Sequence, residues 1–186
     1  LLAEKQPSAN VYLESFIVPN AGLALDALSA AKAFAEGFGL ACYRFDKYFS
    51  KKTETKPLAV FLVASNAKRQ ALFERGIELA NATIAATNFA RDLGNEPSNE
   101  LTPKILADTS KKIASQLGLK CRVMEESELK KQKMGLLLGV GQGSVHPPRL
   151  IVLEYNPKNS KKAKTIAIVG KGITFDSGGI SIKPSM

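Results

Sequence analysis

The first third of the chain has the hydrophobic pattern of a strand, a helix and a second strand. Residues 11–18 have strand character and end at a Pro-Asn pair, and an apolar helical pattern follows over residues 21–41. Residues 58–63 are continuously apolar, as expected of a central strand that is covered on both faces. Residues 1–65 therefore predict a β-α-β unit.

From residue 67 to residue 93 the apolar positions follow a helical period. Phe73, Ile77, Ala80 and Ile84 recur on one face. A helix of this extent is about 40 Å long at 1.5 Å per residue. Gly94 is a suitable residue to end it. A helix this long between two α/β patterns predicts a connector between domains.

The second half of the chain predicts further helices and strands. Thr102 followed by Pro103 predicts a capped helix start, and Gly118 predicts the end of that helix. Residues 119–124 alternate strictly, which indicates a strand with one face in water. The remaining predictions are a short helix over 125–133, a glycine-rich loop over 135–143, and two strands, 149–155 and 165–169, joined as a hairpin.

Composition and charge exclude several classes of protein. With 45% hydrophobic and 23% charged residues, the 186-residue chain is neither disordered, collagen-like nor stapled by disulfides. The helical pattern over 21–41 carries Asp26, Lys32 and Glu36 on one narrow stripe, so it predicts a mostly buried helix rather than a membrane span. Cys42 and Cys121 have no nearby cysteine partner, and we expect free thiols in a reducing, cytoplasmic compartment.

The net charge of +9 is concentrated in one region. Residues 101–164 contain 13 Lys and Arg against 5 Asp and Glu. The first interpretation is a solvated basic surface. The alternative is a surface for nucleic acid or another acidic partner, although no aromatic residues are interleaved with the loop lysines to stack on bases.

The residues with the clearest chemical potential lie in segment 166–183. Lys171, Asp176 and Lys183 are set among glycines, after a predicted buried strand. An ordinary Lys171–Asp176 ion pair is one interpretation. A phosphate-binding loop is a second, but it fails in detail because Lys171 is followed by Gly172 rather than by Ser or Thr.

A metal site is the third interpretation of this segment. Asp176 is a hard oxygen ligand suited to Zn, Mn or Mg, and Lys171 could join it only as a neutral amine. Lys183 could stay charged and stabilise an oxyanion. The usual zinc signatures are absent, and His146, placed before two prolines, is more typical of a structural loop residue than of a ligand. Spacing alone leaves these alternatives open.

Four blocks of sequence resemble one known family. VGKGITFDSGGISIKPS, residues 169–185, is similar nearly residue for residue to the signature of the cytosol (leucyl) aminopeptidases, which are di-metal exopeptidases. The other matching blocks, in the family's order, are EGFGLACYRFDKY at 36–48, ARDLGNEPSNELTP at 90–103 and MGLLLGVGQGSVHPPRLIVLEY at 134–155.

The resemblance implies roles for the three residues. Lys171 would be a ligand of one metal, Asp176 would bridge two divalent ions (Zn or Mn, or Mg), and Lys183 would be the catalytic lysine at the substrate carbonyl. The implied reaction is hydrolysis of an N-terminal peptide bond by a hydroxide that two metals activate, with bicarbonate as a base in the complete enzyme. The implied partners are peptides with a free N-terminus, Leu-like residues preferred, and further copies in a homo-hexamer.

The resemblance also implies a fold. It is an α/β fold of two three-layer α/β domains joined by a long helix, both incomplete in this chain. Residues 1–66 would be the C-terminal part of the N-terminal domain, 67–94 the connecting helix, and 95–186 the start of the catalytic domain.

The chain departs from the family pattern in one respect. The family's later metal-binding aspartate and Asp-x-Glu-x-Arg element are not found in it. We therefore expect the 186-residue chain alone to be inactive. We also expect it to fold poorly by itself, because strands of both domains of the family fold are not in it and apolar faces would be exposed. Two alternatives remain at this point: a DNA-binding member of the family, or a nonenzymatic relative that uses the basic region 101–164.

Overall fold

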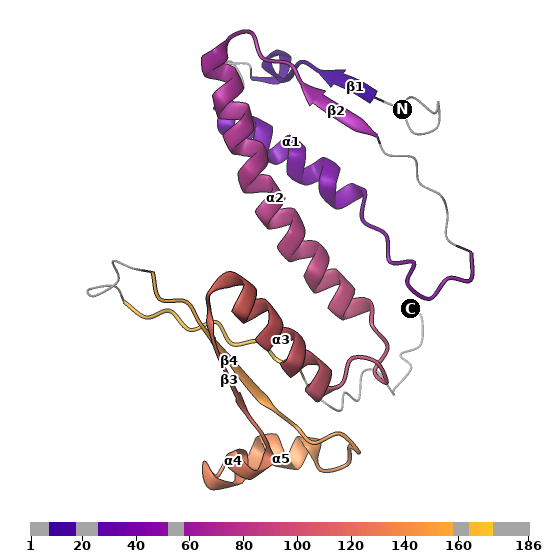
Figure 1. Ribbon diagram of the computed structural model, residues 1–186, viewed down its shortest axis with the longest axis vertical. Coiled ribbons are helices and arrows are strands. Elements are labelled where there is room, and N and C mark those ends of the chain that lie inside the picture. The colour runs from indigo at the N-terminus through magenta and orange to yellow at the C-terminus, as the bar shows by residue number, and fades with distance from the viewer. Residues whose placement is uncertain (1–7, 18–25, 52–57, 158–163, 173–186) are drawn as a thin grey trace, which may run out of the picture. The chain divides into compact units, whose positions relative to one another are not determined.

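The computed structural model describes residues 8–17, 26–51, 58–157 and 164–172. Contacts divide the chain into two compact units, Leu1–Asn95 and Glu96–Met186, each considered by itself (Figure 1). Both units mix helices with strands, which confirms the α/β class.

The first unit contains the predicted β-α-β arrangement. Strand β1 (Ser8–Val11) is followed by the short 3-10 helix η1 (Leu13–Phe16), helix α1 (Ala27–Ala41), strand β2 (Ala59–Leu62) and helix α2 (Ala67–Asn95). The two strands pair in parallel, with Ser8 opposite Ala59 and Val11 opposite Leu62.

The strand predicted over residues 11–18 is wrong over residues 12–17, and residue 18 lies outside the described residues. The chain turns into η1 at Leu13, whose side chain is buried in the core with Ala27, Ala31 and Phe73. Glu14 in the same turn accepts hydrogen bonds from the backbone and hydroxyl of Ser65, at 3.2 and 2.8 Å. The burial of Leu13 and the two bonds of Glu14 both stabilise the turn, so tertiary contacts override the local strand pattern.

Two other expectations for this unit need correction. Helix α1 begins at Ala27 rather than at residue 21, because Asp26 has extended backbone and its carboxylate accepts the Ser29 N–H at 2.8 Å as an N-cap. Residues 21–25 lie outside the described residues. Strand β2 is not covered on both faces in the described structure: it alternates between half-buried and exposed residues, and Phe61 is 57% exposed.

Helix α2 confirms the predicted long helix. Phe73 and Ala80 are buried, and Ile77 and Ile84 are half-buried, so the predicted stripe is the packed one. The helix lies along α1 and continues past Gly94 to Asn95 (Figure 1). Its role as a connector between domains stays a prediction.

The second unit confirms the capped helix and the alternating strand. Helix α3 (Pro103–Leu117) is followed by strand β3 (Lys120–Met124), helices α4 (Glu126–Lys131) and α5 (Gly135–Gly141), and strand β4 (Leu150–Glu154). Gly118 ends α3 with φ of 68°, a conformation that favours glycine. Strands β3 and β4 pair antiparallel, Lys120 opposite Glu154 and Met124 opposite Leu150.

Two predictions for the second unit are wrong. The glycine-rich stretch after residue 134 is the helix α5 rather than a loop. Residues 165–169 are described, but they form no strand and no hairpin with β4, and Ile166 and Ile168 are 85% and 95% exposed. Within the described ranges, no helix is both long and apolar enough to cross a lipid bilayer.

Candidate functional site

Of the three candidate residues, the structure describes only Lys171. It lies between Gly170 and Gly172 in segment 164–172, which is neither helix nor strand, and it is exposed. Asp176 and Lys183 lie outside the described residues, so their roles and their proximity to Lys171 stay predictions. A buried strand was expected to lead into Lys171. Residues 165–169 instead form no strand and are exposed, and no strand among the described residues pairs with them.

The Lys171 segment forms one wall of a groove of about 560 Å³ within the second unit. The other walls come from the N-terminal turn of α3 with the residues before it, one face of α5, and the start of β4 with the loop that leads into it. Antiparallel pairing places the first residue of β4 beside Met124, the last residue of β3. The apolar side chains in the lining are Leu101, Leu106, Leu136, Leu137, Val140, Leu150 and Ile151.

Two further side chains with ionisable groups, Arg149 and His146, line this groove, and Arg149 was not among the residues predicted from the sequence. Arg149 lies directly before β4, is 16% exposed at its side chain, and its Nη2 lies 3.4 Å from Glu125 Oε1. The signal that could have indicated it is a charged residue immediately before an apolar strand. His146 is exposed, and its backbone N–H donates to Ser144 Oγ at 3.1 Å.

Basic residues around α3 affect one carboxylate near the groove. Lys104 donates a hydrogen bond to Asp108 Oδ2 at 3.1 Å, and this bond is the main cause that lowers the pKa of Asp108. The charges of Lys104, Lys111 and Arg149 lower that pKa further. Asp108 therefore stays ionised and partly neutralises the basic surface of this unit.

The start of α3 is determined by its capping residue. Thr102 has extended backbone, is buried to 8% exposure, and accepts the Ile105 N–H on its hydroxyl at 3.4 Å. Pro103 then occupies the first helical position, where a missing N–H costs nothing. This cap fixes where the α3 wall of the groove begins, because Thr102 and Pro103 both line it.

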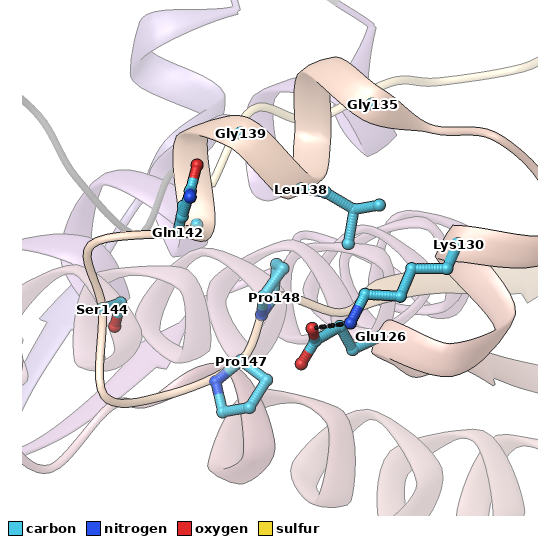
Figure 2. A pocket seen from close by; sticks show the side chains of 10 residues that line it. Glu126, Lys130, Gly135, Leu138, Gly139, Gln142, Ser144, Pro147 and Pro148 are labelled. Carbon is cyan, nitrogen blue, oxygen red and sulfur yellow. Dashed lines mark ion pairs between the residues drawn. The ribbon is translucent and has the colours of Figure 1, made fainter.

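A second pocket, of about 450 Å³, lies between α4, α5 and the Pro147-Pro148 loop (Figure 2). An ion pair between Glu126 and Lys130, 2.6 Å apart, stands at its edge. At Gly141 an added Cβ would lie 2.8 Å from Pro148, so a glycine permits the close approach of loop and helix.

The described residues do not by themselves form a metal site. Within these ranges no three His, Cys, Asp or Glu side chains gather closely enough to hold an ion. Two coordination spheres need more donors than Lys171 and Asp176 supply. The metal-site hypothesis thus depends on Asp176, which lies outside the described residues. It also depends on donors other than Lys171 and Asp176.

A family model matches residues 88–186, and its description is "Cytosol aminopeptidase family, catalytic domain". The match includes the positions of Lys171, Asp176 and Lys183. The sequence predicted the start of a catalytic domain over residues 95–186, and the matched range begins seven residues earlier, within α2.

The chain is also similar to curated proteins and to solved structures. It is 45% identical over 153 residues to a probable cytosol aminopeptidase of Aquifex aeolicus, and 42% identical over 178 residues to one of Solibacter usitatus. These alignments cover 82% and 94% of the chain but 30% and 36% of the relatives. The chain thus spans about a third of the length of the curated relatives it matches.

Among solved structures, a mutant of tomato leucine aminopeptidase matches with a TM-score of 0.73 and 29% identity, over 86% of this chain and 32% of that one. The bottromycin maturation enzyme BotP in complex with Mn matches with a TM-score of 0.62 and 33% identity, over 82% of this chain and 30% of that one.

Proposed function

The chain belongs to the cytosol aminopeptidase family, and on this premise we propose that the protein is a metal-dependent aminopeptidase that hydrolyses the first peptide bond of its substrates. The observation that carries this proposal is the match of the catalytic-domain model to residues 88–186, which includes all three candidate site residues. The likeness to tomato leucine aminopeptidase supports the same reaction class.

In this proposal two of the three residues bind metal and the third stabilises charge on the substrate. Lys171, as a neutral amine, and Asp176, through its two carboxylate oxygens, hold divalent ions. Lys183 keeps its positive charge and lies at the substrate carbonyl. A fixed cation at that position stabilises the negative charge that develops on the carbonyl oxygen when the bond is attacked.

The metal ions supply Lewis acidity and a water of lowered pKa when bound. Zn or Mn, or Mg, would suit the carboxylate donor, and the relative BotP has been solved with Mn. Because Lys171 and Asp176 are too few to complete two coordination spheres, we propose that donors elsewhere in the full-length protein complete them. Bicarbonate as an accessory base is part of the same proposal.

The finer features are likewise proposals. We propose peptides with a free N-terminus as substrates, with a preference for Leu-like first residues, and a homo-hexameric assembly of two three-layer α/β domains. A cytoplasmic location is supported by the name of the relatives, which are cytosol aminopeptidases.

The alternative functions are not proposed. Several of the basic residues in region 101–164 are paired with carboxylates, among them Lys104 with Asp108, Arg122 with Glu128, and Lys130 with Glu126. None of the relatives reported above is named as a DNA-binding protein. A nonenzymatic role has no observation in its favour.

The test is release of leucine from leucine amide by the full-length protein, with and without added Mn²⁺. We expect hydrolysis only with metal. Lys183→Ala should lower kcat by about 10²- to 10³-fold, the effect of removing one oxyanion-stabilising group. Lys171→Ala and Asp176→Ala should lower the metal content measured on the purified protein.

A matched control is Lys164→Ala, which removes an exposed lysine seven residues before Lys171 and outside the signature segment. It should retain both activity and metal. Full-length protein without metal-dependent hydrolysis would refute the proposal, and equal loss in the Lys164 and Lys183 variants would refute the role of Lys183.

A further inference from the structure

The fully buried residues of helix α2 all lie in its first half, and Ile84, just beyond them, packs against Gly39 of α1. The buried residues are Phe73, Gly76 and Ala80. Residues 81–95 contain no buried residue in the described structure. Ala80 lies 15 residues before the end of the helix at Asn95, a distance of about 22 Å at 1.5 Å per residue. Beyond the contact of Ile84 with Gly39, polar contacts join the last turn of α2 to the end of α1.

A group of polar side chains lies at that far end. The hydroxyl of Tyr43 donates to Asp92 Oδ1 at 2.8 Å and accepts from Asn95 Nδ2 at 3.1 Å. Tyr43 is half-buried and follows α1, so these two bonds join segments 49 and 52 residues apart in sequence. One hydroxyl thus uses both its donor and an acceptor site on the last turn of α2.

Arg91 adds a second connection, from a side chain of α2 to the backbone of α1. Its Nη1 donates to the carbonyl oxygen of Leu40 at 2.9 Å, in the last turn of α1, and its guanidinium carbon lies 5.3 Å from the centre of the Tyr43 ring. The last turn of α1 contains no basic residue of its own. Arg91 therefore supplies the cation that favours a helix C-terminus, and it donates to a carbonyl oxygen of the last turn that also accepts the Tyr43 N–H at 3.4 Å.

The start of the family match, at residue 88, lies between the two groups of residues that these contacts join. The catalytic-domain model begins at residue 88, so Arg91, Asp92 and Asn95 belong to the matched segment, whereas Leu40 and Tyr43 precede it. The contacts thus join the first residues of the catalytic segment to the part of the chain before it.

We propose that Tyr43, Arg91, Asp92 and Asn95, here named the Tyr43 cluster, anchor the end of α2 to the end of α1 and so fix the point from which the catalytic segment continues. Tyr43 acts as a positioning residue through Asp92 and Asn95. This proposal rests on contacts within the first unit and does not depend on the proposed peptidase reaction.

The test is amide hydrogen exchange in the full-length protein carrying Tyr43→Phe, which removes one oxygen and retains the ring. We expect the amides of residues 91–95 to exchange about fivefold faster, the effect of one lost net hydrogen bond, while residues 70–80 are unchanged. Cleavage by added protease within residues 96–101 should also become faster.

Tyr12→Phe is the matched control, because Tyr12 is 61% exposed and lies outside the Tyr43 cluster. It should leave both measurements unchanged. Asp92→Asn, which keeps an acceptor, should resemble the wild type, whereas Asp92→Ala should resemble Tyr43→Phe. Unchanged exchange at 91–95 in Tyr43→Phe, or equal acceleration at 70–80, would overturn the proposal.

Discussion

Gly76 of α2 lies directly against the backbone of Leu28 in α1. A Cβ added at Gly76 would lie 2.6 Å from the Leu28 carbonyl oxygen and 3.0 Å from both Ala31 Cβ and the Lys32 nitrogen. Two of these three neighbours are backbone atoms, which cannot rotate away as a flexible side chain can. The closeness of the two helices thus depends on the absence of a side chain at one residue.

Gly76→Ala should therefore destabilise the full-length protein by about 1–3 kcal/mol, the usual cost of overpacking. The measurement is urea unfolding followed by far-UV circular dichroism. Gly94→Ala is the matched control in the same helix, because an added Cβ there meets nothing within 4 Å. It should be neutral or slightly stabilising, and equal destabilisation by both changes would contradict the packing argument.

Removal of the α3 cap should have a moderate effect. Thr102→Ala leaves the Ile105 N–H without its side-chain acceptor and should cost about 1 kcal/mol of unfolding free energy. Thr102→Ser retains the hydroxyl and should recover most of that loss. Urea unfolding of both variants distinguishes the cap from simple loss of volume, and a similar loss in the Ser variant would point to volume.

The cap of α1 should make stability depend on acid pH. The hydrogen bond from the Ser29 N–H, followed by that from the Ser29 hydroxyl, lowers the pKa of Asp26 in the folded state. The contribution of ionised Asp26 is therefore complete above the unfolded pKa and is lost as pH falls through the lowered folded pKa. Thermal unfolding at successively lower pH should show a smaller decline in Asp26→Asn, whose neutral amide still caps the helix. An identical decline in both proteins would exclude this contribution.

The 186-residue chain in isolation should unfold without a cooperative transition and should self-associate. Leu136, which lines the groove, is 92% exposed, and the neighbouring residues Ile168 and Val169 are 95% and 93% exposed. Large apolar side chains exposed to this degree favour association with other chains. Calorimetry and light scattering of the isolated chain measure both properties. A cooperative melt of a monomeric chain would show that this exposure is tolerated.

Local signals in the sequence were sufficient where one residue type satisfies a backbone requirement. Thr102 and Pro103 begin α3, Gly118 ends it in the left-handed conformation, and the alternation over 119–124 matches the exposed and half-buried faces of β3. The long apolar stripe likewise predicted α2. In each case the determining atoms lie within a few residues of one another.

Two of the incorrect predictions concern segments whose conformation depends on distant partners. Leu13 leaves the strand pattern because the core and Ser65 hold its turn. The start of α1 is different: Asp26 caps the helix through Ser29, three residues away, so a local signal was present there. Residues 165–169 have an apolar strand pattern, yet without a pairing neighbour among the described residues the pattern does not make a strand.

The sequence by itself determined the family, the caps of α3 and the long helix, because motif identity, capping atoms and helical period are local properties of the chain. Only the tertiary structure decided that Gly76 must approach α1, that Tyr43 reaches Asp92, and that Arg149 and Lys171 line one groove. Those relationships join residues 22 to 49 positions apart, and no local pattern records which distant side chains will meet.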